Sequence, residues 1–376
     1  MTARRCVVAG GGTAGHIFVS LAVAGALSKG VGSQHEIELF GSARGLETAL
    51  VAGSGFRLRL MGGRGIVRAM TPAAMWSNVA AIAGLALATI RATGRFLVAR
   101  PWVVVSVGGY ASVPAGIAAA ALRVPLVLVS VDAVPGAAQR LLSRFAAGSA
   151  VAFEGTRLPK AVVTGAPLRA EVVAGTSLQR DEALASLALP PERKTVAIFG
   201  GSLGAGHLND VALGLSSLWA DRADRTVVHV CGTRNFASVS AAAFQAGHEG
   251  SGATLCYRLI GFQSDMASLY RAADVVVCRA GALSIAELAL FGVPAVLVPL
   301  PNSPGDHQSK NAAALSQGGG ALVIQDGSLD AAGLSGVLDD LLGSQGRLEA
   351  MARACKSMGR SDAAQAVAEV VRACAR

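Results

Sequence analysis

The sequence has few aromatic residues and few charges. Aromatic side chains make up 5% of the 376 residues, and charged side chains make up 15%. So few aromatic rings argue against a stacking surface for single-stranded nucleic acid. Hydrophobic residues reach 52%, which excludes a disordered chain, because disordered chains lack the apolar surface that offsets the entropy of ordering.

Cysteine is also scarce. No two of the six cysteines have the spacing of a CxxC redox or zinc motif, since they stand at Cys6, Cys231, Cys256, Cys278, Cys355 and Cys374. We therefore expect reduced, buried thiols rather than a disulfide framework. The sequence shows no acidic pair of the DxD type and no cluster of histidine and cysteine, so we predict neither a bound metal nor a cofactor.

Carboxylates are absent from a long part of the first half. None occurs between Glu47 and Asp132, whereas eight arginines lie there. Up to Gly165 the chain carries 16 Lys+Arg and 5 Asp+Glu, a net charge of +11, and the remainder carries 17 and 19, a net charge of −2, which together give +9. A basic half beside a near-neutral half indicates that one domain meets an anionic partner. On charge alone, nucleic acid and an anionic membrane surface both fit.

Long uninterrupted apolar runs are lacking as well. The start of the chain resembles a signal peptide only faintly, because its apolar stretch soon breaks into Gly10-Gly11-Gly12. The most apolar helical candidate, over residues 75–90, is interrupted by Ser77 and Asn78. It does not supply the roughly 20 apolar residues that a spanning helix needs. We therefore expect a protein without a spanning helix that can still contact a membrane surface.

The sequence does have a regular alternation of short β-branched runs and longer stretches rich in alanine and leucine. Most of the strand candidates are continuously apolar, as strands buried on both faces are. The alternation predicts an α/β protein with parallel sheets. A strand, a glycine loop and a helix start occur at 7–15 and again at 196–205. We therefore predict one doubly wound domain in each half, with ligand in the cleft between the carboxyl ends of the two sheets.

The first glycine loop, Gly10-x-Gly12-x-x-Gly15, has the spacing of the dinucleotide fingerprint. The second predicted strand ends without the acidic residue that would hold a dinucleotide's ribose, so a hydride-transferring enzyme is disfavoured. The loop still offers backbone N–H groups and a helix N-terminus to an anion, and the alternative is a tight turn that binds nothing. His16 follows at the helix start and is a candidate general base, with a packing role as the alternative.

The densest group of polar residues lies over 274–287, where a buried strand passes through a glycine turn into a helix. Ser284 and Glu287 have the spacing of a capping box, which would make Glu287 a structural residue. The functional alternative is a carboxylate that accepts hydrogen bonds from ribose hydroxyls, with the helix N-terminus facing phosphate. A polar loop over 299–308 follows the next buried strand, where its groups could meet a sugar.

These stretches together resemble the bacterial undecaprenyl-diphospho-muramoylpentapeptide N-acetylglucosaminyltransferase family, whose members convert lipid I to lipid II. The matching pieces occur in the family's order over essentially the whole chain: GGGTAGH at 10–16, GLE at 45–47, SVGGY at 106–110 with Pro114, GAPLR at 165–169, GGSLGA at 200–205, the block over 273–287, and DHQ at 306–308 with Asn311. The resemblance implies two Rossmann-like domains facing across a cleft, the GT-B architecture. It implies an acceptor- and membrane-associated domain over 1–167, onto which a C-terminal helix at about 360–376 packs back, and a UDP-GlcNAc-binding domain over 168–359.

The resemblance also implies a set of substrate-binding positions: Thr13, Ala14, Gly15, Asp132, Arg169, Ser202, Gln263, Ala282, Leu283, Ser284, Ile285, Ala286, Glu287 and Gln308. Glu287 would hold the ribose, with residues 282–286 along the nucleotide and the diphosphate. Gln263 would lie by the uracil, and Gln308 would bind GlcNAc hydroxyls. Ser202 and Arg169 would contact the diphosphate and sugar side of the donor.

The implied reaction is an inverting transfer in which the C4 hydroxyl of MurNAc in lipid I attacks C1 of GlcNAc. His16 would be the base, and helix N-termini would stabilise the departing UDP. The implied partners are UDP-GlcNAc, lipid I and an anionic membrane surface, with no nucleic acid, for a peripheral protein on the cytoplasmic face of the cell membrane. A stripe of Met75, Val79, Ile82 and Ala86 between arginines suits shallow insertion among headgroups, and the alternative is that it packs on the sheet.

The sequence departs from the family's pattern at two places in the first half. The family's proline in the first helix is missing, since Phe18-Val19-Ser20 leads into Leu21 here. Val129-Ser130-Val131-Asp132 stands where the family usually has His-Glu-Gln-Asn. This second change falls in the region expected to meet the acceptor and the donor sugar. Two alternatives therefore accompany the main hypothesis: a non-catalytic relative that binds UDP-GlcNAc or lipid I, and a glycosyltransferase of the same fold with another acceptor.

Overall fold

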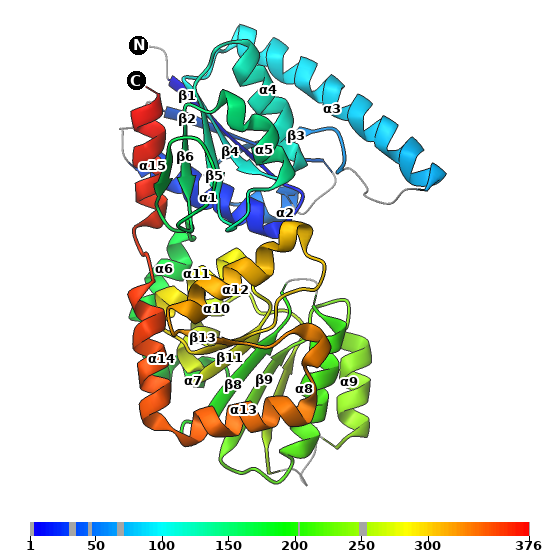
Figure 1. The fold of residues 1–376 in the computed structure, drawn as a ribbon, viewed down its shortest axis with the longest axis vertical. Helices are drawn as coiled ribbons and strands as arrows, with labels where there is room; N and C mark the ends of the chain where they lie inside the picture. The colour runs from blue at the N-terminus through cyan, green and yellow to red at the C-terminus, as the bar shows by residue number, and fades with distance from the viewer. Residues whose placement is uncertain are drawn as a thin grey trace. The chain divides into compact units, whose positions relative to one another are not determined.

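The computed structural model describes residues 4–29, 35–43, 47–65, 71–201, 204–247 and 254–375. The chain forms two compact units, one made of residues 1–170 and 361–376 and the other of residues 171–360 (Figure 1). Each unit contains one parallel sheet with helices around it. The predicted fold class of two Rossmann-like domains is confirmed. The division between the units falls three residues after the predicted boundary at 167.

The first unit is built on a seven-stranded sheet with the order β3-β2-β1-β4-β5-β6-β7. Its strands are β1 (Arg4–Gly10), β2 (His35–Ser42), β3 (Arg57–Met61), β4 (Val103–Gly108), β5 (Leu126–Ser130), β6 (Gly148–Val151) and β7 (Ala161–Val163). All residues of β4 and β5 are buried, because helices cover both faces of such a sheet. The winding direction reverses between β1 and β4, which is the switch point where doubly wound sheets bind their ligands.

The helices of the first unit include one from the far end of the chain. They are α1 (Ala14–Lys29), α2 (Glu47–Val51), α3 (Pro72–Val98), α4 (Val113–Ala121), α5 (Ala137–Leu142) and α15 (Ala363–Cys374). Helix α15 packs on α1, β5 and β6 (Figure 1), with Val367 and Val371 fully buried. The Arg372 guanidinium donates to the carbonyl of Ala26 near the end of α1 at 3.2 Å. The C-terminal helix therefore completes the first unit.

Helix α3 has two different faces. Its inner face packs against α4 and the core of the first unit through side chains that are at most 1% exposed: Ala81, Ala88, Ala92 and Phe96. The predicted apolar stripe lies elsewhere on the helix, with Met75, Val79 and Ile82 between 56% and 66% exposed. The alternative in which this stripe packs on the sheet is therefore wrong. Figure 1 shows the amino-terminal part of α3 extending away from the rest of the first unit.

The expectation that no helix is long and apolar enough to span a membrane is wrong for the segment Met75–Val98. By length and composition this segment could cross a membrane. An 18-residue stretch of it has a mean hydropathy of 1.4, and 22% of that stretch is buried. Ser77 and Asn78 do interrupt the apolar run, but the helix continues well beyond them and its average stays high. The helix nevertheless belongs to the first unit, because its alanine face covers the core cluster that contains Phe40 and Leu126.

The second unit is built on a six-stranded sheet with the order β10-β9-β8-β11-β12-β13. Its strands are β8 (Lys194–Phe199), β9 (Arg225–Val230), β10 (Cys256–Ile260), β11 (Val275–Cys278), β12 (Ala295–Leu297) and β13 (Ala321–Val323). Its helices are α6 (Ala170–Ala174, whose first residue still belongs to the first unit), α7 (Arg180–Ser186), α8 (Gly206–Leu218), α9 (Phe236–Gln245), α10 (Met266–Ala272), α11 (Ala282–Phe291), α12 (His307–Gln317), α13 (Ala331–Gly343) and α14 (Gln345–Ser357). The switch point of this sheet lies between β8 and β11.

Candidate functional site

In the first unit, two glycine turns meet at the switch point of the sheet. After β1 the backbone passes through Gly10, Gly11 and Gly12 into α1, and after β4 it passes through Gly108 and Gly109. Gly109 has a φ of 73°, and a Cβ placed on it would lie 2.2 Å from the carbonyl oxygen of Gly11. The two turns are therefore in direct contact, and a side chain at Gly109 would force them apart.

His16, the third residue of α1, lies half-buried against these turns. Its Nδ1 is 2.9 Å from the hydroxyl oxygen of Thr13, and a Cβ on Gly108 would lie 3.2 Å from its Nε2. Burial lowers the pKa of His16 from its ordinary value of 6.5, while the charges of Asp132 and Glu47 act in the opposite direction. The imidazole is therefore mainly neutral at neutral pH, which is the form that a general base requires.

Glu47, the first residue of α2, supports the first glycine turn. Its side chain is buried, and Oε1 accepts hydrogen bonds from the backbone N–H of Gly12 at 2.8 Å and of Ser42 at 2.9 Å. These two hydrogen bonds tie the turn after β1 to the end of β2, so Glu47 holds the turn in place. This role of Glu47 could not be predicted from the sequence, because Glu47 lies 35 residues from Gly12 and only the fold brings the two together.

The segment that departs from the family's pattern lies at the same edge of the first sheet. Asp132 follows β5, and its charge acts on His16. The segment is held by Gln139, whose side-chain amide donates to the carbonyl of Val129 at 2.5 Å. The predicted positions Thr13, Asp132 and His16 are thus brought together.

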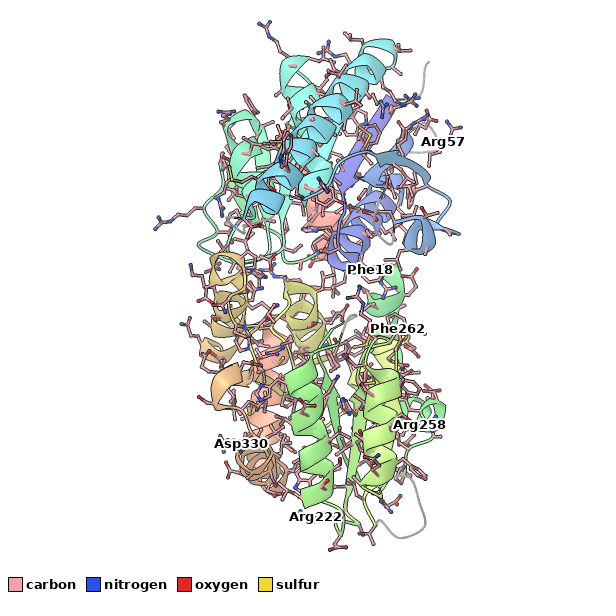
Figure 2. All side chains as sticks on the ribbon, turned by 90° about the vertical axis from the view of Figure 1, so that its right-hand side faces the viewer. Phe18, Arg57, Arg222, Arg258, Phe262 and Asp330 are labelled. Carbon is pink, nitrogen blue, oxygen red and sulfur yellow. The ribbon has the colours of Figure 1, made fainter. Side chains whose placement is uncertain are left out.

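Arg169, predicted to contact the donor, also belongs to the first unit. Its guanidinium carbon lies 4.3 Å from the centre of the Phe18 ring, a stacking contact between a cation and an aromatic face. Phe18 lies on α1, where Figure 2 labels it. In this structure Arg169 therefore contacts the helix that carries His16.

In the second unit, the glycine turn after β11 begins helix α11. Gly281 is the N-cap, and the first backbone bond of the helix runs from the N–H of Ile285 to the carbonyl of Gly281 at 3.0 Å. The N–H groups of Ala282, Leu283 and Ser284 therefore have no partner within the helix and can meet an anion. The interpretation of Ser284 as an N-cap is wrong, because the helix begins two residues before it. The capping box that would have made Glu287 a structural residue is therefore absent.

Glu287 lies in the second turn of α11, partly exposed. Its Oε2 accepts a hydrogen bond of 2.8 Å from the hydroxyl of Tyr270 on α10, which is buried. Among the positions before Glu287, Ala282 and Ile285 are buried, so only their backbone could meet a ligand. Leu283, Ser284 and Ala286 are partly exposed.

The turn before α11 is tied to the neighbouring polar loop. The guanidinium of Arg279 pairs with Asp326 at 2.6 Å and also donates to the carbonyl of Pro299 at 3.3 Å. Asn311, fully buried on α12, donates to the carbonyl of Ala280 at 3.2 Å. These contacts fix the ends of β11 and β12 relative to each other, and with them the start of α11.

Two other predicted donor residues lie at the same edge of the second sheet. Gln308, in the first turn of α12, accepts a hydrogen bond from the N–H of Leu300 at 2.9 Å, and Gln263, after β10, donates to the carbonyl of Asp265 at 2.8 Å. Figure 2 labels Phe262, which precedes Gln263 in the sequence. Ser202 lies outside the described residues. Within the described ranges, no group of three or more His, Cys, Asp or Glu could hold a metal ion.

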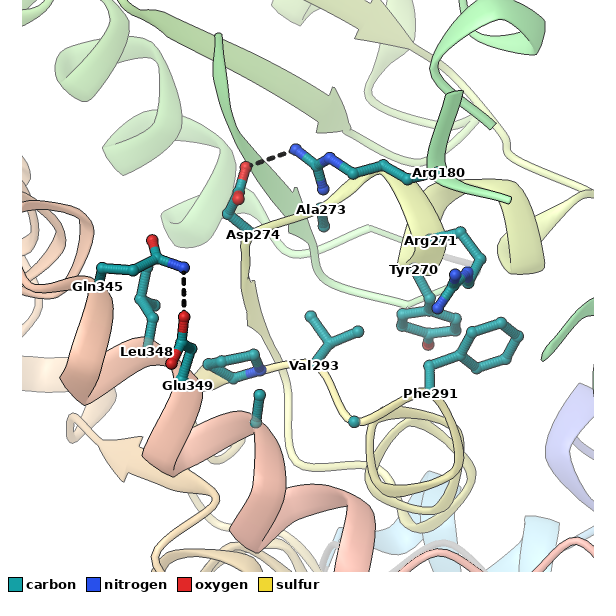
Figure 3. A pocket seen from close by; sticks show the side chains of 13 residues that line it. Arg180, Tyr270, Arg271, Ala273, Asp274, Phe291, Val293, Gln345, Leu348 and Glu349 are labelled. Carbon is teal, nitrogen blue, oxygen red and sulfur yellow. Dashed lines mark hydrogen bonds and ion pairs between the residues drawn. The ribbon is translucent and has the colours of Figure 1, made fainter. Parts of the chain in front are cut away.

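A cavity of about 250 Å³ lies in another part of the second unit (Figure 3). Its lining includes Asp274 and Pro294, which precede β11 and β12, so the cavity lies at the amino ends of these strands. Doubly wound sheets bind ligands at the carboxyl ends, so we do not assign the donor to it. Tyr270 is one of the residues that line this cavity. Its hydroxyl, however, donates a hydrogen bond to Glu287 on α11.

The sequence matches two family models. The model of the glycosyltransferase family 28 N-terminal domain covers residues 6–151, and that of the C-terminal domain covers residues 195–367. The UDP-N-acetylglucosamine–N-acetylmuramyl-(pentapeptide) pyrophosphoryl-undecaprenol N-acetylglucosamine transferase of Shewanella loihica is 36% identical over 372 residues, which cover 98% of this chain and 96% of that protein. The protein of the same name from Acidothermus cellulolyticus is 37% identical over 371 residues, which cover 97% and 96%.

Solved structures agree with this relationship. The crystal structure of Acinetobacter baumannii MurG has a TM-score of 0.75 at 27% identity and covers 98% of this chain and 99% of its own. A UDP-GlcNAc 2-epimerase from Neisseria meningitidis, at 13% identity and a TM-score of 0.64 over 98% of this chain and 100% of its own, shares the fold alone. The fold, the two switch-point turns and these matches define a two-domain glycosyltransferase of the GT-B type. The chain belongs to glycosyltransferase family 28.

The contact between the two turns of the first unit predicts a large effect of Gly109→Ala. Both the positive φ and the overlap with the Gly11 carbonyl should act, so we expect a loss of about 2–4 kcal/mol in the free energy of unfolding, measured in urea. Gly53→Ala is the matched control, because Gly53 has a φ of 80° but no heavy atom within 4 Å of an added Cβ. Equal losses in the two variants would contradict the described contact.

Proposed function

We propose that this chain transfers GlcNAc from UDP-GlcNAc to the C4 hydroxyl of MurNAc in lipid I, with inversion at C1, and so forms lipid II for peptidoglycan synthesis. The observation that carries the proposal is the identity of 36% and 37% over nearly the whole chain to relatives that bear this activity in their name. The start of α11 with Glu287, and His16 at the start of α1, provide the groups that such a transfer needs.

In the proposed donor site, the diphosphate lies at the N-terminus of α11. Three N–H groups there have no partner within the helix, and the glycine N-cap brings no side chain that would compete with the anion. Glu287, farther along the helix, would accept hydrogen bonds from the ribose hydroxyls. Gln263 would lie by the uracil and Gln308 by the GlcNAc hydroxyls, since both follow strands at the same edge of the sheet.

The proposed chemistry moves one proton and one sugar. As the MurNAc C4 oxygen bonds to C1 of GlcNAc, the bond from C1 to the UDP oxygen breaks and its electron pair leaves with UDP. His16 would take the proton of the attacking hydroxyl, because its imidazole is neutral at neutral pH. Thr13 would orient the ring through its hydroxyl, and the N–H groups of α11 would stabilise the charge on the departing diphosphate.

The direct test incubates the purified protein with labelled UDP-GlcNAc and a lipid I analogue. We expect a β-1,4-linked GlcNAc–MurNAc product with release of UDP. Binding of UDP-GlcNAc without turnover would favour the non-catalytic alternative that the substitutions at 129–132 suggest. Transfer to a different acceptor would favour the other alternative. No transfer under conditions in which a family 28 relative is active would contradict the proposal.

The candidate base predicts a pH profile. Because burial lowers the pKa of His16 from 6.5, kcat/KM should be level at neutral pH and should fall on acidification below about pH 6.5, as the imidazole becomes protonated. His16→Ala should lower kcat by roughly 10²–10⁴-fold and remove this acid limb.

Asp132→Asn is the matched variant, because Asp132 is the other ionisable candidate beside the first glycine turn. We expect equal or higher activity and an acid limb at lower pH, since the charge of Asp132 raises the pKa of His16. If Asp132→Asn removes the limb while His16→Ala keeps it, the base is Asp132. A loss below tenfold in His16→Ala would leave His16 as a positioning group.

We also propose that the first unit docks as a peripheral protein on the anionic membrane surface at the cytoplasmic face. The docking surface is the α3 patch, which we define as Met75, Trp76, Val79, Ile82, Ala86 and Ile90. Its large side chains are 56–75% exposed, and such an apolar face in a segment without carboxylates suits an anionic interface. The six free cysteines fit a reducing compartment.

The arginines expected to flank the apolar stripe are Arg64, Arg68, Arg91, Arg95 and Arg100, and they differ in their contacts. Arg91 is exposed at the end of the patch. Arg95 instead pairs with Glu38 at 3.1 Å, and Arg64 donates to the carbonyl of Ser77 at 2.8 Å. Arg68 lies outside the described residues. A test of docking is therefore cleaner with a substitution in the apolar patch than with charge reversal at Arg95, which would disturb its pair with buried Glu38.

We predict that Ile82→Glu abolishes sedimentation of the protein with anionic phosphatidylglycerol vesicles at low salt. Phe244→Glu is the matched control, because it places the same charge at a 69% exposed apolar position of the second unit. High salt should release much of the bound wild-type protein. Ile82→Glu should still turn over a short-chain, water-soluble lipid I analogue. If the wild-type protein does not bind these vesicles, the docking proposal is wrong.

A further inference from the structure

Tyr270 is held rigidly inside the second unit. Its side chain is 1% exposed on α10, and its ring packs against Phe199 at 6.1 Å and Phe291 at 5.4 Å between ring centres. Figure 3 shows Tyr270 beside Phe291 at the edge of the cavity. Packing on two sides fixes the direction in which the phenol points.

The hydroxyl of Tyr270 ends on the carboxylate proposed to hold the ribose. It donates to Oε2 of Glu287 at 2.8 Å. Burial raises the pKa of Tyr270 well above its ordinary value of 10, and the charge of Glu287 raises it further. The phenol therefore stays protonated and remains a donor at neutral pH.

A glutamate side chain has several rotatable bonds, so its carboxylate is not oriented by the helix alone. Ordering such a side chain costs conformational entropy when a ligand binds. A fixed donor on one carboxylate oxygen removes part of this cost before the nucleotide arrives. No contact with the nucleotide itself is needed for this effect, since Tyr270 is buried behind Glu287.

We propose that Tyr270 is a positioning residue for the donor ribose, which orients Glu287 through its hydroxyl and so makes the site discriminate between ribose and deoxyribose nucleotides. The inference rests on the proposed role of Glu287. It predicts that the Tyr270 hydroxyl contributes to the affinity for UDP only when the ribose hydroxyls are present.

The test measures the binding of UDP and of 2′,3′-dideoxy-UDP by calorimetry. Tyr270→Phe keeps the ring and removes the hydroxyl. We expect it to weaken UDP binding roughly three- to tenfold, the effect of one hydrogen bond, and to leave dideoxy-UDP binding unchanged. Tyr257→Phe is the matched control, because the Tyr257 hydroxyl bonds to Nδ1 of His229 at 2.8 Å in the same unit. The control should bind both nucleotides like the wild-type protein.

The two proposals fail in distinguishable ways. If the wild-type protein binds UDP and dideoxy-UDP equally, the role of Glu287 is wrong. If the wild-type protein discriminates and Glu287→Gln loses the discrimination, but Tyr270→Phe keeps it, only the inference about Tyr270 is wrong. Equal weakening of both nucleotides in Tyr270→Phe, or a lower melting temperature with an unchanged affinity ratio, would likewise reduce Tyr270 to a packing residue and overturn the inference.

Discussion

The abrupt change from a buried parallel strand to a helix is the constraint on which both units depend. At each switch point the chain must turn within a few residues and leave the first N–H groups of a helix facing the edge of the sheet. In the first unit the two turns touch so closely that Gly109 has no room for a side chain. In the second unit Gly281 begins α11 without a side-chain cap. These turns need support, and buried polar groups provide it.

Two supporting groups lie in stretches that match the family's pattern, but the contacts that they make could not be predicted from the sequence. Glu47 holds the first turn, and Asn311 holds the turn before α11. Each lies about 30 residues or more from its partner, so no local pattern reports the contact. Tyr270 is nearer to Glu287 in sequence, but a tyrosine in a short apolar helix looks like an ordinary core residue. Only the packing of α10 and α11 shows where its hydroxyl points.

The sequence predicted the fold class because buried parallel strands leave a local signal, a continuous apolar run. The sequence did not predict β3, in which arginine alternates with apolar residues, β6, which begins with glycine and serine, or β13. The start of α11 was placed too late, since Ser284 followed by Glu287 mimics a capping box. The apolar pattern of α3 was evident from the sequence. The pattern did not show which of the apolar residues are buried. Alanine at 81, 88 and 92 allows close packing against α4, and most of the larger side chains other than Phe96 face outward.

The proposed position of the donor diphosphate at the N-terminus of α11 can be tested on the unmodified protein. Calorimetric titration with UDP and with uridine compares ligands that share base and ribose and differ only in the anion. We predict that UDP binds at least about tenfold more tightly than uridine, because only UDP can accept hydrogen bonds from the helix start with charged oxygens. Equal affinities for UDP and uridine would contradict it.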